Sequence, residues 1–262
     1  MTTPTVSQAV EENYLPAVPK VSIPQHSLLT SIILHLLPGI VFLAVWFLVT
    51  PLVKRWGLPA AIAGSLAILL GQLPLVFGVL LYQSRKQTGH FSLRDVIAYR
   101  RPVPFWQYLI FVPLLCIWYF QASSIWTSLQ KDLFTNLPWL PRWLENPLPF
   151  IDQGPYSPLV TTITLGVALI SSGIIAPIIE ELYFRGFLLP RIDRLGVWAV
   201  LLNVSLFALH HLWTPLLNPG RILAWFPIIF IVWRKQNIYI GLSVHLITNL
   251  MGNGLLVLLS ML

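Results

Sequence analysis

The chain has 262 residues, of which 56% are hydrophobic and 10% are charged, and its mean hydropathy is +0.75. These values exclude a soluble domain and indicate a polytopic membrane protein. The formal net charge of +7 does not indicate nucleic-acid binding, because the basic residues are scattered in short loops between apolar runs, where they act as topology determinants.

The amino-terminal residues 1–27 precede the first apolar run. They match neither a signal peptide nor an arginine-rich transit sequence. We therefore expect residues 1–27 to form a disordered cytoplasmic tail and the first span to be an uncleaved anchor. The only cysteine, Cys116, lies within an apolar run, which excludes a disulfide framework and a cysteine-rich metal cluster.

Apolar runs that approach the roughly 20 residues needed to span a bilayer as a helix lie at about 28–53, 58–82, 105–122, 158–179, 195–213, 215–233 and 238–262. The run 215–233 is interrupted by Pro215, Pro219 and Pro227, which predict a short or broken helix. The loop 123–157 has room for an eighth helix. The sequence therefore predicts an all-α transmembrane helix bundle of seven to eight spans, occupying residues 28–262.

The distribution of lysine and arginine predicts the orientation. With a cytoplasmic amino terminus, eleven of the 16 basic residues fall on the cytoplasmic side, and five fall opposite: Lys54, Arg55, Lys131, Arg142 and Arg221. The amino terminus is therefore expected in the cytoplasm. Since no targeting sequence is evident, we expect a multi-pass protein of a bacterial plasma membrane.

Several ionisable side chains lie inside the predicted spans. Such a side chain costs several kcal/mol in lipid unless it is paired or hydrated, so each is a functional candidate. With a rise of about 1.5 Å per residue, the candidates on three helices lie at comparable depths below the cytoplasmic surface. They are Glu180, Glu181, Arg185, His210, His211 and His245, with Asn249 as a polar companion.

Helical phase separates the two adjacent glutamates. Residues four apart share a helix face, so Glu181 and Arg185 are expected to form an ion pair. Glu180 then has no partner on its own helix and is the expected base. The other pairs that share a face are Phe207 with His211 and His245 with Asn249.

Three short motifs resemble, in the same order, those of the CPBP family, which comprises type II CAAX prenyl proteases and bacteriocin-processing proteins and is also called the ABI family. They are "EELYFR" at 180–185, "FALHH" at 207–211 and "HLITN" at 245–249. The resemblance covers about residues 160–255, within a motif-bearing core at 158–262. It implies an intramembrane endopeptidase whose partners are the lipid bilayer and a membrane protein or a lipidated, prenylated-type peptide.

The resemblance also implies a role for each motif residue. Glu180 and His211 would activate water, and His245 and Asn249 would stabilise the oxyanion, without metal or other cofactor. The residue types suit this chemistry, because amide hydrolysis needs a base for water and hydrogen-bond donors for the developing charge. The supporting residues are Glu181, Arg185, Phe207 and His210. We expect the site to open toward the cytoplasm.

Two alternatives use the same residues. In the first, Glu180, His211 and His245 bind zinc, since two histidines and a carboxylate form a catalytic ligand set; the absence of an H-E-x-x-H spacing ranks it lower. In the second, the chain is a catalytically silent membrane scaffold or immunity partner. The Glu181–Arg185 pair would then hold its helix in register, and the histidines would be satisfied core residues.

Overall fold

The computed structural model describes the backbone of residues 23–141 and 154–260, and the side chains of residues 23–141 and 154–252. Within these residues the chain forms helices, with one isolated β-bridge between Arg100 and Asn237 and no strand. The predicted all-α class is therefore confirmed. Most of the predicted tail, residues 1–22, lies outside the described residues.

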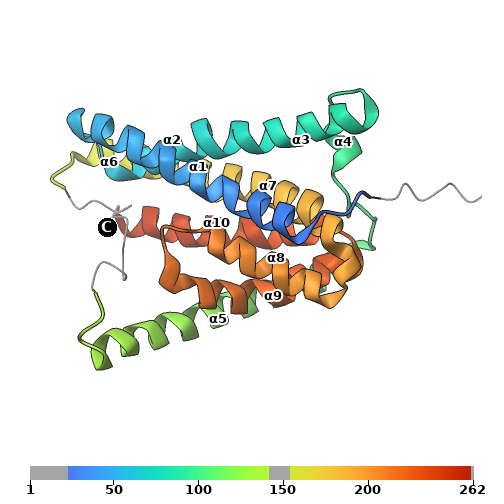
Figure 1. Ribbon diagram of the computed structural model, residues 1–262. Coiled ribbons are helices and arrows are strands. Elements are labelled where there is room, and N and C mark those ends of the chain that lie inside the picture. Colours follow the sequence, from blue (N-terminus) through green and yellow to red (C-terminus); the bar gives the residue numbers. More distant parts are fainter. Residues whose placement is uncertain (1–22, 142–153, 261–262) are drawn as a thin grey trace, which may run out of the picture.

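Seven apolar helical segments form the bundle, and they run side by side along a common axis (Figure 1). Five are long enough to cross a membrane, and α8 and the described part of α10 are shorter apolar helices. The segments are α1 (Leu28–Arg55), the continuous α2 (Ala60–Ala67), η1 (Ile68–Gln72) and α3 (Leu73–Thr88), α5 (Phe105–Asn136), the fourth segment Pro158–Leu195, α8 (Val197–His210), α9 (Asn218–Lys235) and α10 (Ile238–Ser260).

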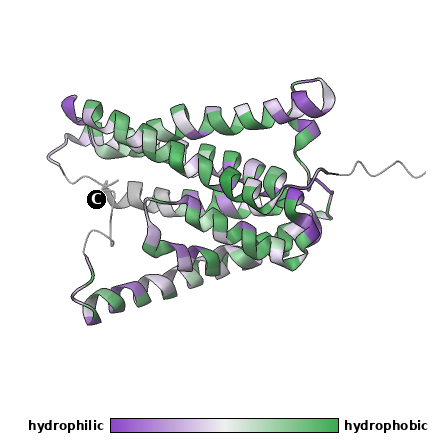
Figure 2. Cartoon of the chain, viewed as in Figure 1, coloured by the Kyte–Doolittle hydropathy of each residue, from purple (hydrophilic) through white to green (hydrophobic). Residues whose placement is uncertain are grey.

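The expected eighth helix is not found in the described part of the loop 123–157. Residues 123–136 continue α5, residues 154–157 are not helical, and residues 142–153 lie outside the described residues. A four-residue helix, α4 (Leu93–Val96), is too short to span. Figure 2 shows apolar residues along the length of the helices, as expected for a bundle whose outer face meets lipid.

Of the short or broken helix predicted at 215–233, the structure has the short form, because α9 is a continuous helix of 18 residues that begins only at Asn218. Pro219 lies in its first turn, where no backbone N–H is required. Pro227 lies inside the helix and leaves the carbonyl of Leu223 without its usual donor. Trp118 of α5 supplies the missing bond, with its Nε1 donating to that carbonyl at 3.2 Å.

The same arrangement supports α1. Pro38 lies inside this helix and cannot donate to the carbonyl of Leu34. The hydroxyl of Tyr183, in the motif-bearing segment, donates to that carbonyl at 2.9 Å. Tertiary hydrogen bonds thus keep both helices continuous and tie α1 to the site.

The fourth segment is not a uniform α-helix. It consists of α6 (Pro158–Ile170), the π-helical η3 (Ser171–Ile175), α7 (Ala176–Glu180), the π-helical η4 (Glu181–Leu188) and the 3₁₀-helical η5 (Leu189–Leu195). The short α7 between the two π-helical stretches ends at Glu180, and the second stretch begins at Glu181. Turns of this kind occur often at functional sites.

The helix pair α8 and α9 is shorter than its neighbours. The connection between them, residues 211–217, stops short of the ends that α1 and α6 reach (Figure 1). The first residue of this connection is His211, which therefore lies inside the bundle. The length of α8 thus determines the depth of the second motif.

Candidate functional site

One cavity of about 570 Å³ brings the predicted catalytic residues together. Its walls include Glu180 at the end of α7, His211 after α8, and His245 and Asn249 on α10. Phe207, expected as a supporting residue, also lines it. The three motifs therefore converge, although they are separated by more than 20 residues along the chain.

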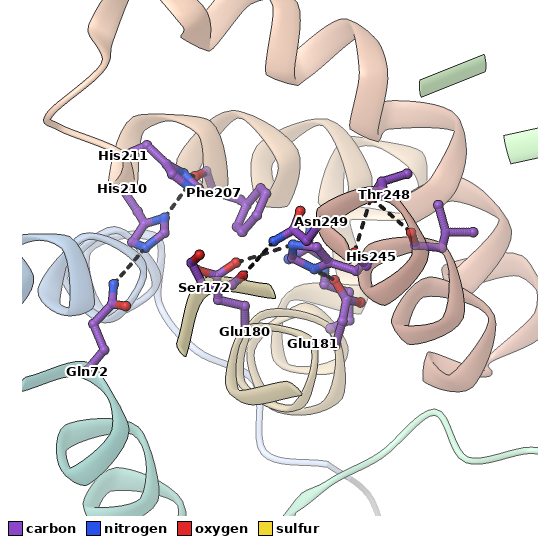
Figure 3. A network of polar contacts seen from close by, with 12 residues as sticks. Gln72, Ser172, Glu180, Glu181, Phe207, His210, His211, His245, Thr248 and Asn249 are labelled. Carbon is purple, nitrogen blue, oxygen red and sulfur yellow. Dashed lines mark hydrogen bonds and ion pairs between the residues drawn. The ribbon is translucent and has the colours of Figure 1, made fainter. Parts of the chain in front are cut away.

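His245 lies between the two adjacent glutamates (Figure 3). Its Nδ1 is 3.0 Å from Glu181 Oε1, and because a carboxylate accepts, Nδ1 carries a hydrogen and donates it. Its Nε2 faces Glu180 Oε2 at 3.7 Å. Helical phase alone did not indicate that Glu181 contacts His245.

The predicted ion pair between Glu181 and Arg185 is confirmed, with 3.4 Å between Oε1 and Nη1, and both side chains are buried. The guanidinium carbon lies 3.9 Å from the centre of the Phe207 ring and 5.1 Å from that of Trp225. These faces stabilise the cation by cation–π contacts. The role of Phe207 beside the site is therefore to pack on Arg185.

Charge balance links Glu180 to His245. Because the Glu181–Arg185 pair is neutral, the remaining carboxylate and imidazole are least costly to bury when they too have no net charge. One proton, carried by either Glu180 or His245 Nε2, satisfies this condition. The pair then exists as carboxylate and imidazolium, or as carboxylic acid and neutral imidazole.

The two neighbouring histidines differ in their surroundings. The Nδ1 atoms of His210 and His211 lie 3.1 and 2.9 Å from the carbonyl of Phe207, so both Nδ1 atoms donate. The Nε2 of His210 then accepts from the amide of Gln72 at 3.3 Å, and its side chain is fully buried. His211 instead lines the cavity, where its Nε2 is an acceptor.

Asn249 is anchored on the cavity wall. Its Nδ2 donates to the backbone carbonyl of Ser172 in η3 at 3.0 Å (Figure 3). This bond links α10 to η3, which precedes Glu180 in the fourth segment. His245 and Asn249, one turn apart on α10, both line the cavity, as their spacing predicts.

Three further residues matter at the site, and the sequence interpretation did not select them. Gln72 is the one amide side chain in the apolar run 58–82, a signal that was available. Arg221 lines the cavity and bonds neutral partners, Thr214 Oγ1 at 2.7 Å and Asn218 Oδ1 at 2.9 Å. A Cβ added to Gly241 would lie 2.7 Å from Glu181 Oε2, so this glycine permits the close approach of α10.

The geometry also bears on the zinc alternative. Among the described residues, Glu180, His210 and His211 have potential ligand atoms within 4.8 Å of one another. This group differs from the predicted set, since His210 takes the place of His245. The potential ligand atom of His210, Nε2, already accepts a hydrogen bond from Gln72. Metal binding would require Gln72 to release it.

Comparison with known proteins agrees with the motifs. Residues 162–251 match the family model described as type II CAAX prenyl endopeptidase Rce1-like. The match includes all three motifs and covers less than half of the 262 residues. No curated protein and no solved structure matches the chain. The chain is therefore an integral membrane protein whose residues 162–251 are similar to the type II CAAX prenyl endopeptidases of the Rce1-like family, which are proteases.

Proposed function

We propose that the chain is a metal-independent intramembrane endopeptidase of the glutamic type, which hydrolyses a peptide bond of a membrane-associated or lipidated protein. The observation that carries this proposal is the single cavity lined by Glu180, His211, His245 and Asn249. A carboxylate and an imidazole acceptor face a space large enough for water and an extended peptide. No serine or cysteine nucleophile is needed.

The position of the one proton carried by Glu180 or His245 defines the starting state. When it resides on His245 Nε2, Glu180 is ionised and can take a proton from a water molecule as that water attacks the scissile carbonyl. His245 Nε2–H and the amide of Asn249 are the donors for the oxyanion. Glu181 holds His245 in orientation by accepting from Nδ1.

Collapse of the tetrahedral intermediate needs a proton on the leaving amine. Glu180 holds the proton taken from water and returns it, directly or through His211 Nε2, to the departing nitrogen. The carbon–nitrogen bond breaks, the products are a carboxylic acid and an amine, and the enzyme regains its initial protonation. His211 is suited to this transfer because its Nδ1–H is fixed on the Phe207 carbonyl.

The proposed location is a bacterial plasma membrane, with a cytoplasmic amino terminus. Support comes from seven exposed basic residues at one end of the bundle, namely Arg85, Lys86, Arg94, Arg100, Arg101, Arg194 and Arg234. At the other end the described exposed basic residues are Lys54, Arg55 and Lys131. An excess of exposed basic residues is typical of the cytoplasmic side of a membrane protein.

The proposal is tested by comparing membranes that contain wild-type protein or the Glu180→Gln variant. We expect a set of membrane proteins to be cleaved only with wild-type protein, and purified wild-type protein in liposomes to cleave a peptide spanning the mapped site. Identical cleavage by Glu180→Gln would contradict the proposal. A biological effect that persists in this variant would support the non-catalytic scaffold.

The zinc-dependent protease is a second candidate, favoured by the proximity of Glu180, His210 and His211. The bound ion would act as a Lewis acid and activate water. It ranks lower because His210 is already hydrogen-bonded through both ring nitrogens. Chelation separates the two candidates.

A further inference from the structure

A second hollow lies on the outer surface of the bundle, between α5 and α10. This groove has a volume of about 470 Å³, and none of the described residues that line it also lines the cavity of Glu180. Residues four apart share a helix face, so the lining residues include one stripe on each helix over about 12 Å. The stripes are Phe105, Leu109 and Pro113 on α5, and Tyr239, Ser243 and Ile247 on α10.

The walls of the groove are apolar and face outward. Leu109 is 61% exposed and Ile247 is 38% exposed, although both side chains are aliphatic. The hydroxyl of Ser243 donates to the backbone carbonyl of Tyr239 at 2.8 Å and requires no further partner. This short side chain between two longer ones leaves the stripe on α10 recessed in the middle. The groove therefore suits a hydrocarbon chain of the surrounding bilayer.

Cations gather at one end of the groove, where both helices begin (Figure 1). The backbone of Arg101 is fixed beside the start of α10, because its N–H donates to the carbonyl of Gln236 at 2.9 Å and its carbonyl accepts from Asn237 Nδ2 at 2.8 Å. Lys235, the last residue of α9, lies at the same end, and its ammonium is 5.4 Å from the centre of the Phe111 ring of α5.

These cations have no ion-pair partner in the part of the chain that the structure describes. No described carboxylate lies within 4 Å of a side-chain nitrogen of Arg101 or Lys235. Neither α5 nor α10 has an acidic residue in its first turn. Asp193 lies at this end of the bundle, but its Oδ1 accepts from Tyr99 and Trp233. This end of the groove therefore attracts an anion.

Tyrosine rings lie between the cations and the aliphatic part of the groove. Tyr108 and Tyr239 line it near the start of their helices, and the hydroxyl of Tyr108 accepts from Asn237 Nδ2 at 3.0 Å. Tyrosines are enriched at the level of the head groups in membrane proteins. The order of cations, tyrosines and aliphatic residues along the groove matches the order of phosphate, interface and acyl chain in a phospholipid.

We infer that the groove binds an anionic phospholipid, with its phosphate at Arg101 and Lys235 and an acyl chain between α5 and α10. Basic pockets between membrane helices bind head groups of this kind. A zwitterionic lipid carries an additional cation that these side chains repel, so it binds more weakly. The bound lipid packs on Ser243 and Ile247, on either side of His245, and so stabilises the helix that carries the third motif. Lipid binding requires no cleavage and is independent of the proposed function.

Native mass spectrometry and thermal unfolding of the purified, delipidated full chain in detergent test the site. Phosphatidylglycerol and phosphatidylcholine with identical acyl chains are added separately. We expect phosphatidylglycerol to form an adduct with one chain at a concentration at least about fivefold lower than phosphatidylcholine requires, since a basic residue near a lipid head group contributes about a factor of five. Phosphatidylglycerol should also raise the melting temperature more.

Three variants locate the lipid. Arg101→Gln should weaken phosphatidylglycerol binding about fivefold, and adding Lys235→Gln should weaken it about fivefold more. Lys86→Gln is the matched control, because it removes an exposed charge of α3 at the same end of the bundle, outside the groove, and should change binding less than about twofold. Ser243→Trp fills the groove and should remove the adducts of both lipids.

Several results would overturn the inference. Equal binding of the two lipids, an equal loss in Arg101→Gln and Lys86→Gln, or full binding in Ser243→Trp would show that the groove does not select an anionic lipid. Inorganic phosphate that raises the melting temperature as much as phosphatidylglycerol does would indicate a site for a free anion. A lipid-free dimer that Ser243→Trp dissociates would assign the groove to a second copy of the chain.

Discussion

His245 lies between two consecutive carboxylates, with its Nδ1 3.0 Å from Glu181 Oε1 and its Nε2 3.7 Å from Glu180 Oε2. The two glutamates nevertheless have different surroundings. Glu181 also pairs with buried Arg185, whereas Glu180 lines the cavity. Adjacent residues of one type thus differ, since Glu181 is held by His245 and Arg185 and Glu180 faces the cavity.

The two glutamates should respond differently to the same substitution. Glu181→Gln leaves Arg185 buried without a counter-charge, so we expect it to lower the free energy of unfolding by about 3–5 kcal/mol. Glu180→Gln removes no partner of an arginine and should change stability by less than about 1 kcal/mol, while cleavage falls by roughly a hundredfold or more. Unfolding in detergent and cleavage assays measure the two effects. Equal destabilisation by both variants would contradict this division.

Gly241→Ala should damage the site although it changes only one methyl group. The added Cβ would lie 2.7 Å from Glu181 Oε2 and 2.9 Å from a Val232 methyl carbon, so α10 or Glu181 must move. We expect a loss of about 1–3 kcal/mol in stability, together with lower activity as the contact between His245 and Glu181 is disturbed.

The matched control is Gly252→Ala on the same helix, where the added Cβ meets no atom within 4 Å. This change should be neutral or slightly stabilising, because alanine favours a helix over glycine. Thermal unfolding of both variants provides the comparison. An equal response at the two positions would show that close packing at Gly241 is not needed.

The sequence predicted what local rules determine. Seven apolar runs follow from composition, and the Glu181–Arg185 pair follows from spacing along one helix. The convergence of Glu180, His211 and His245 followed from motif order and approximate depth. The roles of these residues stay predictions, since proximity alone does not establish catalysis.

What escaped prediction depends on contacts between helices. The break expected around Pro227 is absent because Trp118, more than 100 residues away, donates to the freed carbonyl. The need for Gly241 arises from the approach of α10 to η4.

Arg221 should contribute to activity more than to folding. Its guanidinium lines the cavity and bonds Thr214 and Asn218, and no described carboxylate lies within ion-pair distance of it. A cation at this wall favours the negative charge that develops in the transition state. We expect Arg221→Gln to lower kcat/KM at least about tenfold, and Arg221→Lys to retain part of the activity. Wild-type activity in Arg221→Gln would contradict this role.

Chelation should leave cleavage unchanged if the reaction is metal-independent. Purified protein is treated with 1,10-phenanthroline or EDTA and then assayed with and without added zinc. Loss of activity on chelation and its return with zinc would instead establish the metalloprotease. An unrelated zinc protease assayed in parallel confirms that the chelator is effective.

Gln72→Leu makes the same distinction without an activity assay. The substitution removes the donor to His210 Nε2 and leaves that buried nitrogen unpaired, at a cost of about 1–3 kcal/mol. It also frees His210 Nε2 from its hydrogen bond, so that Glu180, His210 and His211 could all offer a ligand atom to a metal ion. If these residues form a zinc site, added zinc should raise the melting temperature of Gln72→Leu, because an ion that binds only the folded state stabilises it. We expect the destabilisation of Gln72→Leu to persist in zinc, because we assign His210 a structural role as the buried neighbour of His211. Recovery of the melting temperature with zinc but not with magnesium would show instead that His210 is a metal ligand.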